Sequence, residues 1–262
     1  MSPEQFLLSH PVFTRTELRS ALPEQSTATL DRTLTRWRRQ GRIERVKRGL
    51  FVRLEHHREG TQVLPDFAVL ASRMASDAAA AYHTALEVHG CAQSIFERFT
   101  FVTWTGVKTA HYRGRLLIPV RPRAQISANR GENWVDTLDR KGLELRVTNL
   151  ERTAVDVLDR PELAGGIEEV WRSLAALPAI DPVALLKYVL LLDSARVAAR
   201  VGFFLESRQA DLAIPASTLE ALQTRLPKQP VYMQRRLGGK LNRRWRLIVP
   251  DELNGPPEEA GV

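Results

Sequence analysis

Apolar residues near the start of the chain recur with the spacing of a helix. Leu30, Leu34 and Trp37 stand at positions i, i+4 and i+7, so they predict one continuous apolar face. Ser26 precedes this segment as a suitable N-terminal cap, and Gly41 follows it as a suitable C-terminal stop. We therefore expect a helix between these two residues, with its polar positions turned away from a small core.

Shorter helices are expected before this one. The stretch "SPEQFLLSH" can form the first, and "FTRTELRSALP" can form the second. In the second stretch Thr14 and Glu17 have the spacing of a capping box, and Pro23 ends the helical pattern. The start of the chain is thus predicted to be a small helical bundle.

A basic β-hairpin is predicted directly after these helices. Apolar and polar residues alternate in "RIERVKRGLFVR", and Gly49 stands where a tight turn needs a residue that tolerates positive φ. Helices followed by such a hairpin predict a winged helix-turn-helix. The hairpin tip, Lys47 and Arg48, would then lie on a DNA backbone or in the minor groove.

The pattern changes after the hairpin and indicates a second domain. Residues 56–66 are polar and carry Gly and Pro, which predicts a linker. We expect a winged-helix domain over residues 1–55, a larger domain over residues 67–250 and a disordered tail over residues 251–262. The predicted fold class is α+β, with an N-terminal winged helix-turn-helix followed by a larger mixed α/β C-terminal domain.

The larger domain is expected to run from helices to strands. The stretch "DFAVLASRMASDAAAAYHTALEVHG" predicts two helices broken near Ser76 and Asp77. Residues 99–147 contain alternating β-branched and aromatic runs with Gly and Pro between them, which predicts strands. Within this region "ANRGENW" is expected to be a loop.

Helical patterns return after residue 147. Thr148 and Glu151 have the spacing of a capping box at the start of the next helix. Arg152 and Asp156 follow at i and i+4, where they can form an ion pair that fixes the helix. Further apolar stripes predict several more helices before a basic segment near the end of the chain.

Basic residues are concentrated in two stretches. Residues 26–53 hold nine Lys and Arg against two acids, and residues 228–246 hold seven and no acid. The chain as a whole has a formal charge of +8 and a pI near 10.1, which favours nucleic acid over an anionic membrane surface. The second stretch predicts a hairpin turning at Gly238 and Gly239, and a candidate secondary basic surface of Arg235, Arg236, Lys240, Arg243 and Arg244.

The helix face opposite Leu30, Leu34 and Trp37 has the residue types that a major-groove helix needs. Small residues stand at its start, where the helix must approach the bases closely, and arginines follow for guanine edges and phosphates. A solvated basic surface, or contact with RNA or a protein, is the alternative interpretation. The candidate DNA-binding residues are Ala28, Thr29, Arg32, Thr35, Arg36, Arg39, Lys47 and Arg48.

Neither a membrane span, a metal site nor a catalytic motif is predicted. No apolar run approaches the roughly 20 residues of a spanning helix, and the single Cys91 fits a reducing compartment, so we expect a cytoplasmic protein. His83, His89 and Cys91 lack the spacing of zinc ligands, and the adjacent His56 and His57 suit a solvated linker. We therefore expect neither a cofactor nor enzymatic activity.

The stretch "VTNLERTAVDVLDRPELAGGIEEVW" combines a helix with a Pro- and Gly-containing break and a second helix. It resembles one family, the AbiEi antitoxins of type IV toxin–antitoxin systems, and is the most specific part of the likeness. The stretches "TLTRWRRQGRIERVKRGLFV", "YHTALEVHG" and "NRRWRLIVP" are similar to the family's winged helix, to a helix early in its C-terminal domain and to its closing strand. The resemblance thus extends over nearly the whole chain.

This resemblance implies a function. AbiEi antitoxins bind inverted repeats in double-stranded DNA of their own promoter, repress the operon, and neutralise a nucleotidyltransferase-like toxin without requiring a stable complex. Two alternatives stay open: a winged-helix regulator with no toxin partner, and a DNA-guided nuclease. The chain after Asp156 lacks the spaced carboxylates and lysine with which a metal-dependent nuclease holds its ion.

Overall fold

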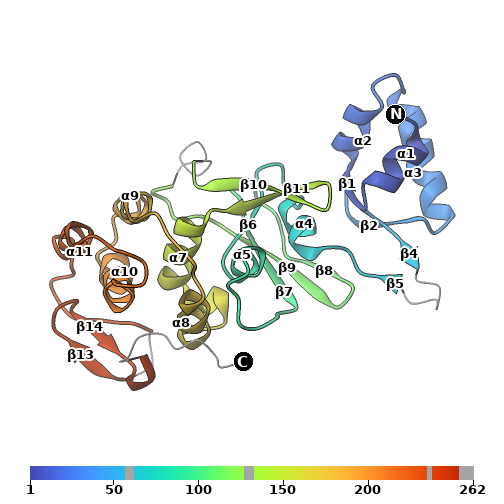
Figure 1. Cartoon of the computed structure of the whole chain (residues 1–262). Coiled ribbons are helices and arrows are strands. Elements are labelled where there is room, and N and C mark those ends of the chain that lie inside the picture. Colours follow the sequence, from blue (N-terminus) through green and yellow to red (C-terminus); the bar gives the residue numbers. More distant parts are fainter. Residues whose placement is uncertain (57–61, 127–132, 235–237, 254–262) are drawn as a thin grey trace. The chain divides into compact units, whose positions relative to one another are not determined.

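The structure is a computed structural model that describes residues 1–56, 62–126, 133–234 and 238–253 (Figure 1). The predicted loop "ANRGENW" lies mostly outside these residues, as does most of the predicted disordered tail. By density of contacts the chain divides into two compact units. The first unit comprises Met1–Ala80, Glu97–Val120 and Thr137–Arg146, and the second comprises Ala81–Phe96, Arg121–Asp136 and Val147–Val262.

The start of the first unit has the predicted order of helices followed by a hairpin (Figure 1). Its elements are α1 (Pro3–Ser9), β1 (Val12–Thr14), α2 (Arg15–Ala21), α3 (Thr27–Arg39), β2 (Ile43–Lys47) and β3 (Leu50–Arg53). The strands form an antiparallel sheet in the order β1-β3-β2, in which β1 pairs with the hairpin strand β3. The strand β1 was not predicted.

Local sequence signals set the ends of these helices. Ser2 and Thr14 each form a complete capping box, and the Ser26 hydroxyl accepts a hydrogen bond from the backbone N–H of Thr29. Gly41 follows the last turn of α3 with a φ of +65°, a conformation that a residue without Cβ adopts at little cost. The predicted caps of α2 and α3 are therefore confirmed.

The apolar stripe of α3 packs into a single core. Leu30, Leu34 and Trp37 are buried together with large side chains of α1 and β1, including Phe6 and Phe13. Trp37 and Phe13 meet edge to face, with ring centres 6.4 Å apart. Because each such side chain contributes about 1.5–3 kcal/mol on burial, this core fixes which face of α3 remains in solvent.

The rest of the described strands lie mainly in one six-stranded sheet, in the order β10-β11-β6-β7-β9-β8. Its strands are β6 (Ala79–Ala80), β7 (Arg98–Val102), β8 (Ala110–Tyr112), β9 (Arg115–Val120), β10 (Val135–Arg140) and β11 (Leu143–Thr148). Two short helices, α4 (Phe67–Ser72) and α5 (His83–Val88), flank β6 in sequence. A further strand pair joins β4 (Glu55–His56) to β5 (Gln62–Val63), and all of it except Glu55 lies within the expected linker.

The prediction for residues 67–90 was wrong in one respect. The first helix ends at Ser72, and the alanine-rich stretch after Asp77 forms strand β6 instead of continuing as helix. Ala79 and Ala80 pair with Val102 and Phe101 of β7, so tertiary pairing overrides the high helix propensity of alanine.

The second unit is mostly helical. Its larger elements are α7 (Leu150–Asp159), the 3-10 turn η1 (Pro161–Ala164), α8 (Ile167–Ala175), α9 (Pro182–Leu192), α10 (Ala195–Ser207) and α11 (Ala216–Gln223). A small sheet follows, made of β12 (Val231–Tyr232), β13 (Lys240–Asn242) and β14 (Leu247–Val249) in the order β12-β14-β13, before the turn η2 (Asp251–Leu253). None of the described helices is long and apolar enough to cross a bilayer.

Two local predictions for the second unit need correction. The cap of α7 is Asn149, whose side chain accepts from the N–H of Arg152, while Glu151 accepts from the N–H of Asp181. The basic hairpin turns between β13 and β14 at residues 243–246, and not at Gly238 and Gly239. The earlier strand β12 runs parallel to β14, so its register depends on a long-range partner that the local pattern does not contain.

The predicted ion pair in α7 is confirmed. Arg152 Nε lies 3.1 Å from Asp156 Oδ2, and both side chains are buried. The other carboxylate oxygen of Asp156 accepts from the Tyr188 hydroxyl at 2.8 Å. The ionised groups are thus paired and hydrogen-bonded, as buried charges must be.

The predicted boundaries of the two domains stay a prediction, because contact density does not show which part folds alone.

Candidate nucleic-acid interface

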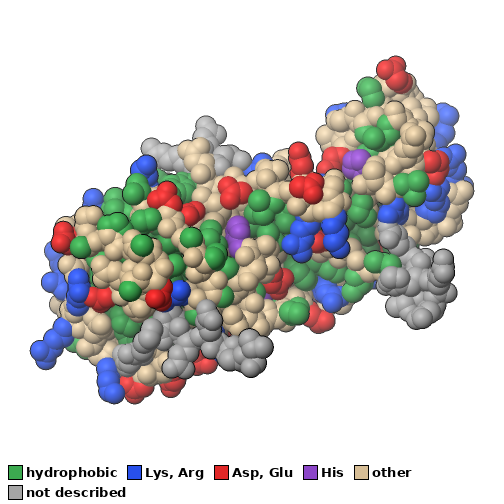
Figure 2. Space-filling view, viewed as in Figure 1, with side chains coloured by type: hydrophobic (Ala, Val, Ile, Leu, Met, Phe, Trp, Pro, Cys, Tyr) green, Lys and Arg blue, Asp and Glu red, His purple; other side chains and the backbone are tan. Residues whose placement is uncertain are grey.

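The polar face of α3 is exposed along its whole length. All six candidate residues of this helix are exposed: Ala28, Thr29, Arg32, Thr35, Arg36 and Arg39. They lie opposite the buried Leu30, Leu34 and Trp37. Figure 2 shows Lys and Arg side chains gathered over the region where Figure 1 labels α3. The core described above therefore turns the arginines outward.

These arginines are available to a ligand. The side chains of Arg32, Arg36 and Arg39 make no hydrogen bond or ion pair with any residue that the structure describes. The acid on this surface, Asp31, is instead paired with Arg15 at 2.7 Å. A shallow groove runs along the face and is lined by Asp31, Arg32, Thr35, Arg36, Arg39 and Gln40.

The two cations at the hairpin tip, Lys47 and Arg48, differ in exposure and in contacts. Arg48 is exposed and unpaired among the described residues, as expected of a side chain that reaches a phosphate. Lys47 is half-buried, its ammonium donates to the carbonyl of Met74, and burial lowers the pKa of Lys47. The structure therefore holds Lys47 against Met74 and leaves Arg48 exposed at the tip.

The single acid of the hairpin is neutralised within the first unit. Glu44 Oε2 accepts hydrogen bonds from the Tyr112 hydroxyl at 2.9 Å and from Arg113 Nη2 at 2.7 Å. Burial and the hydrogen bond to Glu44 raise the pKa of Tyr112 to about 12, so its hydroxyl stays protonated and donates. Arg45, one residue along β2, is exposed and unpaired among the described residues.

Comparison with known proteins connects this segment to a family. Residues 3–53 match a family described as "Transcriptional regulator, AbiEi antitoxin". The resemblance to AbiEi antitoxins is confirmed over these residues. The AbiEi-type segment contains every one of the candidate DNA-binding residues named for α3 and the hairpin.

The other comparisons concern the whole chain. No curated protein matches this sequence. Among solved structures, the chain is similar to the RV2827C protein from Mycobacterium tuberculosis, with a TM-score of 0.58 and 16% identity, over 94% of this chain and 89% of that chain. At this identity the likeness concerns the fold alone. It extends beyond the AbiEi-type segment to the larger part of the chain.

The predicted secondary basic surface is less available. Arg235 and Arg236 lie outside the described residues. Arg244 pairs with Glu206, and Lys240 Nζ lies 3.3 Å from Asp251 Oδ1. Arg243 is exposed.

The histidines and the cysteine of the second unit are packed or hydrogen-bonded within the fold and, among the described residues, are not grouped as metal ligands. His83 is buried and stacked on Phe96 with ring centres 3.8 Å apart, and His89 Nε2 lies 2.8 Å from the carbonyl oxygen of Thr148. Cys91 is buried, and burial raises the pKa of its thiol. Within the described ranges, no three His, Cys, Asp or Glu side chains are placed to hold a metal ion.

One basic cluster was not foreseen from the sequence. Four arginines line a cavity of about 510 Å³ in the second unit: Arg123, Arg160, Arg196 and Arg200. A signal was present, since Arg196 and Arg200 are one helical turn apart within the otherwise apolar stretch of α10. Arg123 and Arg160 come from distant parts of the chain, so spacing alone could not place them there.

Proposed function

We propose that the AbiEi-type segment is a winged-helix DNA-binding domain that lays α3 in the major groove. The observation that carries the proposal is the exposed, unpaired arginine face of α3, fixed by a core on its opposite side. The small Ala28 and Thr29 at the start of the helix permit close approach to the bases. DNA binding accords with the regulatory description of the matched family.

Individual roles follow from position and residue type. We assign Arg32 to base edges, because it lies on the first turns of α3 and a guanidinium can pair with guanine in two hydrogen bonds. Arg36, Arg39 and Arg48 would hold phosphates. Lys47 can join them only by giving up its bond to Met74, so we expect it to contribute less.

The salt dependence of binding tests the proposal. Six exposed side chains in α3 and the hairpin are unpaired among the described residues: Arg32, Arg36, Arg38, Arg39, Arg45 and Arg48. If each neutralises about one phosphate, affinity for duplex DNA should fall by about three decades between 50 and 200 mM salt. Fluorescence anisotropy with the upstream region of its own gene measures this slope.

Two substitutions separate base reading from phosphate contact. Arg32→Ala should relax sequence preference by roughly 1–3 kcal/mol, whereas Arg48→Ala should weaken all sequences alike. Arg225→Ala is a matched control, because Arg225 is also exposed but lies in the second unit. If Arg32→Ala and Arg48→Ala change the binding of all sequences identically, the role assignments are wrong.

We further propose that the chain is an operon autorepressor and antitoxin that acts in the cytoplasm and is not an enzyme. The resemblance of its larger part to AbiEi antitoxins, through "ERTAVDVLDRPELAGG", supports this step. Its partner would be a nucleotidyltransferase-like toxin encoded by the adjacent gene. Co-expression with that gene tests the idea: growth should be rescued by the wild type and by the triple variant Arg32→Ala, Arg36→Ala, Arg39→Ala. Absence of such a gene would favour a regulator without a toxin partner.

A further inference from the structure

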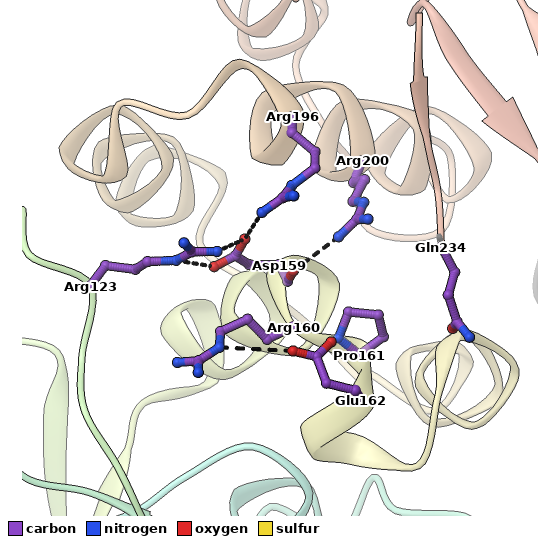
Figure 3. Close-up of a pocket in the computed structure, with 8 residues that line it drawn as sticks. All are labelled: Arg123, Asp159, Arg160, Pro161, Glu162, Arg196, Arg200 and Gln234. Atoms are coloured by element: carbon purple, nitrogen blue, oxygen red, sulfur yellow. Dashed lines mark hydrogen bonds and ion pairs between the residues drawn. The ribbon is translucent and has the colours of Figure 1, made fainter. Parts of the chain in front are cut away.

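The arginine-lined cavity of the second unit is built around the end of α7. Figure 3 shows Arg123, Arg196 and Arg200 converging on Asp159, the last residue of that helix. Arg196 and Arg200 come from α10, while Arg123 comes from the segment after β9. The opposite wall is formed by Arg160, Pro161 and Glu162, with Gln234 at the side (Figure 3).

Asp159, the one buried acid among the described residues of this cavity, is already neutralised. Both carboxylate oxygens of Asp159 accept hydrogen bonds from Arg123, at 2.7 and 2.6 Å, in the two-pronged geometry that guanidinium and carboxylate prefer. Arg196 Nη2 lies further away, at 3.5 Å. The other acid, Glu162, is 69% exposed, and its carboxylate lies as far as 4.0 Å from Arg160 Nε. Among the described lining residues four arginines thus face two carboxylates, which is a surplus of two positive charges.

Arg200 shows where the surplus is located. The side chain is 4% exposed, yet its described hydrogen-bond partners are backbone carbonyls: those of Leu158 and Asp159 at 2.9 Å and that of Tyr232 at 3.0 Å. Burial, and to a smaller extent repulsion from the neighbouring Arg196, lowers the pKa of Arg200 to about 10. A buried cation without a carboxylate in contact is an environment that an added anion would stabilise.

A purely structural role explains only part of this arrangement. Arg200 caps the carbonyls at the end of α7, where a cation also meets the negative end of the helix dipole. That role needs neither Arg160 nor Arg196, whose side chains line the cavity and are 30% and 36% exposed. The Nε atom of Arg196 is buried and has no hydrogen-bond partner among the described residues. These two side chains are the ones a ligand can reach.

We propose that this cavity binds a phosphorylated small molecule that carries at least two negative charges. Guanidinium groups match the oxygens of a phosphate in the same two-pronged way as those of a carboxylate, and two surplus cations match a dianion. The cavity of about 510 Å³ lies in the size range of pockets for small ligands and is larger than one phosphate group requires. The ligand is therefore a pyrophosphate or an organic diphosphate.

Calorimetric titration of the full-length chain tests the proposal at low salt. The probes are sodium pyrophosphate, ADP, adenosine and a short DNA duplex. We expect saturable one-to-one binding of pyrophosphate or ADP and none of adenosine. Binding should weaken at least tenfold in Arg196→Ala and in Arg160→Ala, because each loses a charge-assisted contact to phosphate. A tighter affinity for ADP than for pyrophosphate would identify an organic diphosphate as the source.

Two controls separate the cavity from general basic character. Arg225→Ala removes an exposed arginine of the same unit outside the cavity, and should leave pyrophosphate affinity unchanged within about twofold. The triple α3 variant (Arg32→Ala, Arg36→Ala, Arg39→Ala) should lose DNA binding and keep pyrophosphate binding. The proposal is overturned if neither pyrophosphate nor ADP saturates the wild type, if Arg225→Ala weakens binding as much as Arg196→Ala, or if Arg196→Ala affects only the duplex.

Discussion

Gly202 offers a sharp test of how the C-terminal sheet packs on α10. This glycine lies within the buried part of the helix, and a Cβ built on it would overlap the six-membered ring of the Trp245 indole. Trp245 cannot move aside easily, because its side chain is fully buried and its Nε1 donates to Glu206 Oε2 at 2.6 Å. We predict that Gly202→Ala destabilises the second unit.

The magnitude follows from two opposing effects. Overpacking a filled core costs about 1–3 kcal/mol, and this overlap with a fixed ring belongs at the upper end. Alanine in a helix interior is favoured over glycine by about 1 kcal/mol. The net loss for Gly202→Ala should therefore be about 2 kcal/mol. In a Trp245→Leu background the ring is gone, so the same substitution should stabilise by about 0.5–1 kcal/mol.

Urea unfolding followed by circular dichroism measures both sides of this cycle. The midpoint should fall for Gly202→Ala in the wild type and rise for Gly202→Ala in Trp245→Leu, at unchanged slope. The coupling between the two sites is then about 3 kcal/mol, at the upper limit for residues in contact. Equal effects of Gly202→Ala in the two backgrounds would refute the packing of Trp245 against α10.

Three further predictions concern other parts of the chain. Asp156→Asn removes the carboxylate that pairs with the buried Arg152 and should cost about 3–5 kcal/mol in urea unfolding. Burial acts to raise the pKa of Asp77, but hydrogen bonds from Thr103 and its neighbours prevail, and the pKa is lowered. The stability that this carboxylate contributes is therefore present above its unfolded pKa of 3.8 and is lost as the pH falls below that value. Thermal melts between about pH 5 and 2 should be less pH-dependent in Asp77→Asn than in the wild type. Ser26→Ala removes the cap of α3 and should lower stability by about 1 kcal/mol, while Ser2→Ala, at a cap outside the DNA face, serves as its control for DNA affinity.

The helix α3 could be predicted because everything that specifies it is local. Its stripe of Leu30, Leu34 and Trp37, its cap at Ser26 and its stop at Gly41 all lie within one short stretch of sequence. The same is true of the Arg152–Asp156 pair, whose partners are one helical turn apart. Once the apolar stripe is known, the exposed face follows by geometry, which is why the candidate residues of α3 could be named in advance.

Features that depend on distant partners were missed or wrong. Ala79 and Ala80 form a strand only because β7 pairs with them, and the basic hairpin turns at residues 243–246 because β14 has partners on both sides. Lys47 looked like a free cation at the hairpin tip, yet the carbonyl that binds it belongs to Met74, well along the chain. Sequence spacing contains no information about such contacts, so only the folded chain reveals them.

The arginines that contribute to the net charge of +8 lie in different environments and should respond differently to an external anion. Arg113 is paired with Glu44, and Arg152 is buried against Asp156, so neither is available to an external anion. On α3 the arginines are exposed and unpaired among the described residues, and affinity there should depend steeply on salt because bound counterions are released. In the cavity, Arg200 is buried and Arg160 and Arg196 are partly buried, so screening by salt is weaker and discrimination between anions should be greater. Salt should thus separate the two sites: raising it should abolish duplex binding well before it abolishes pyrophosphate binding.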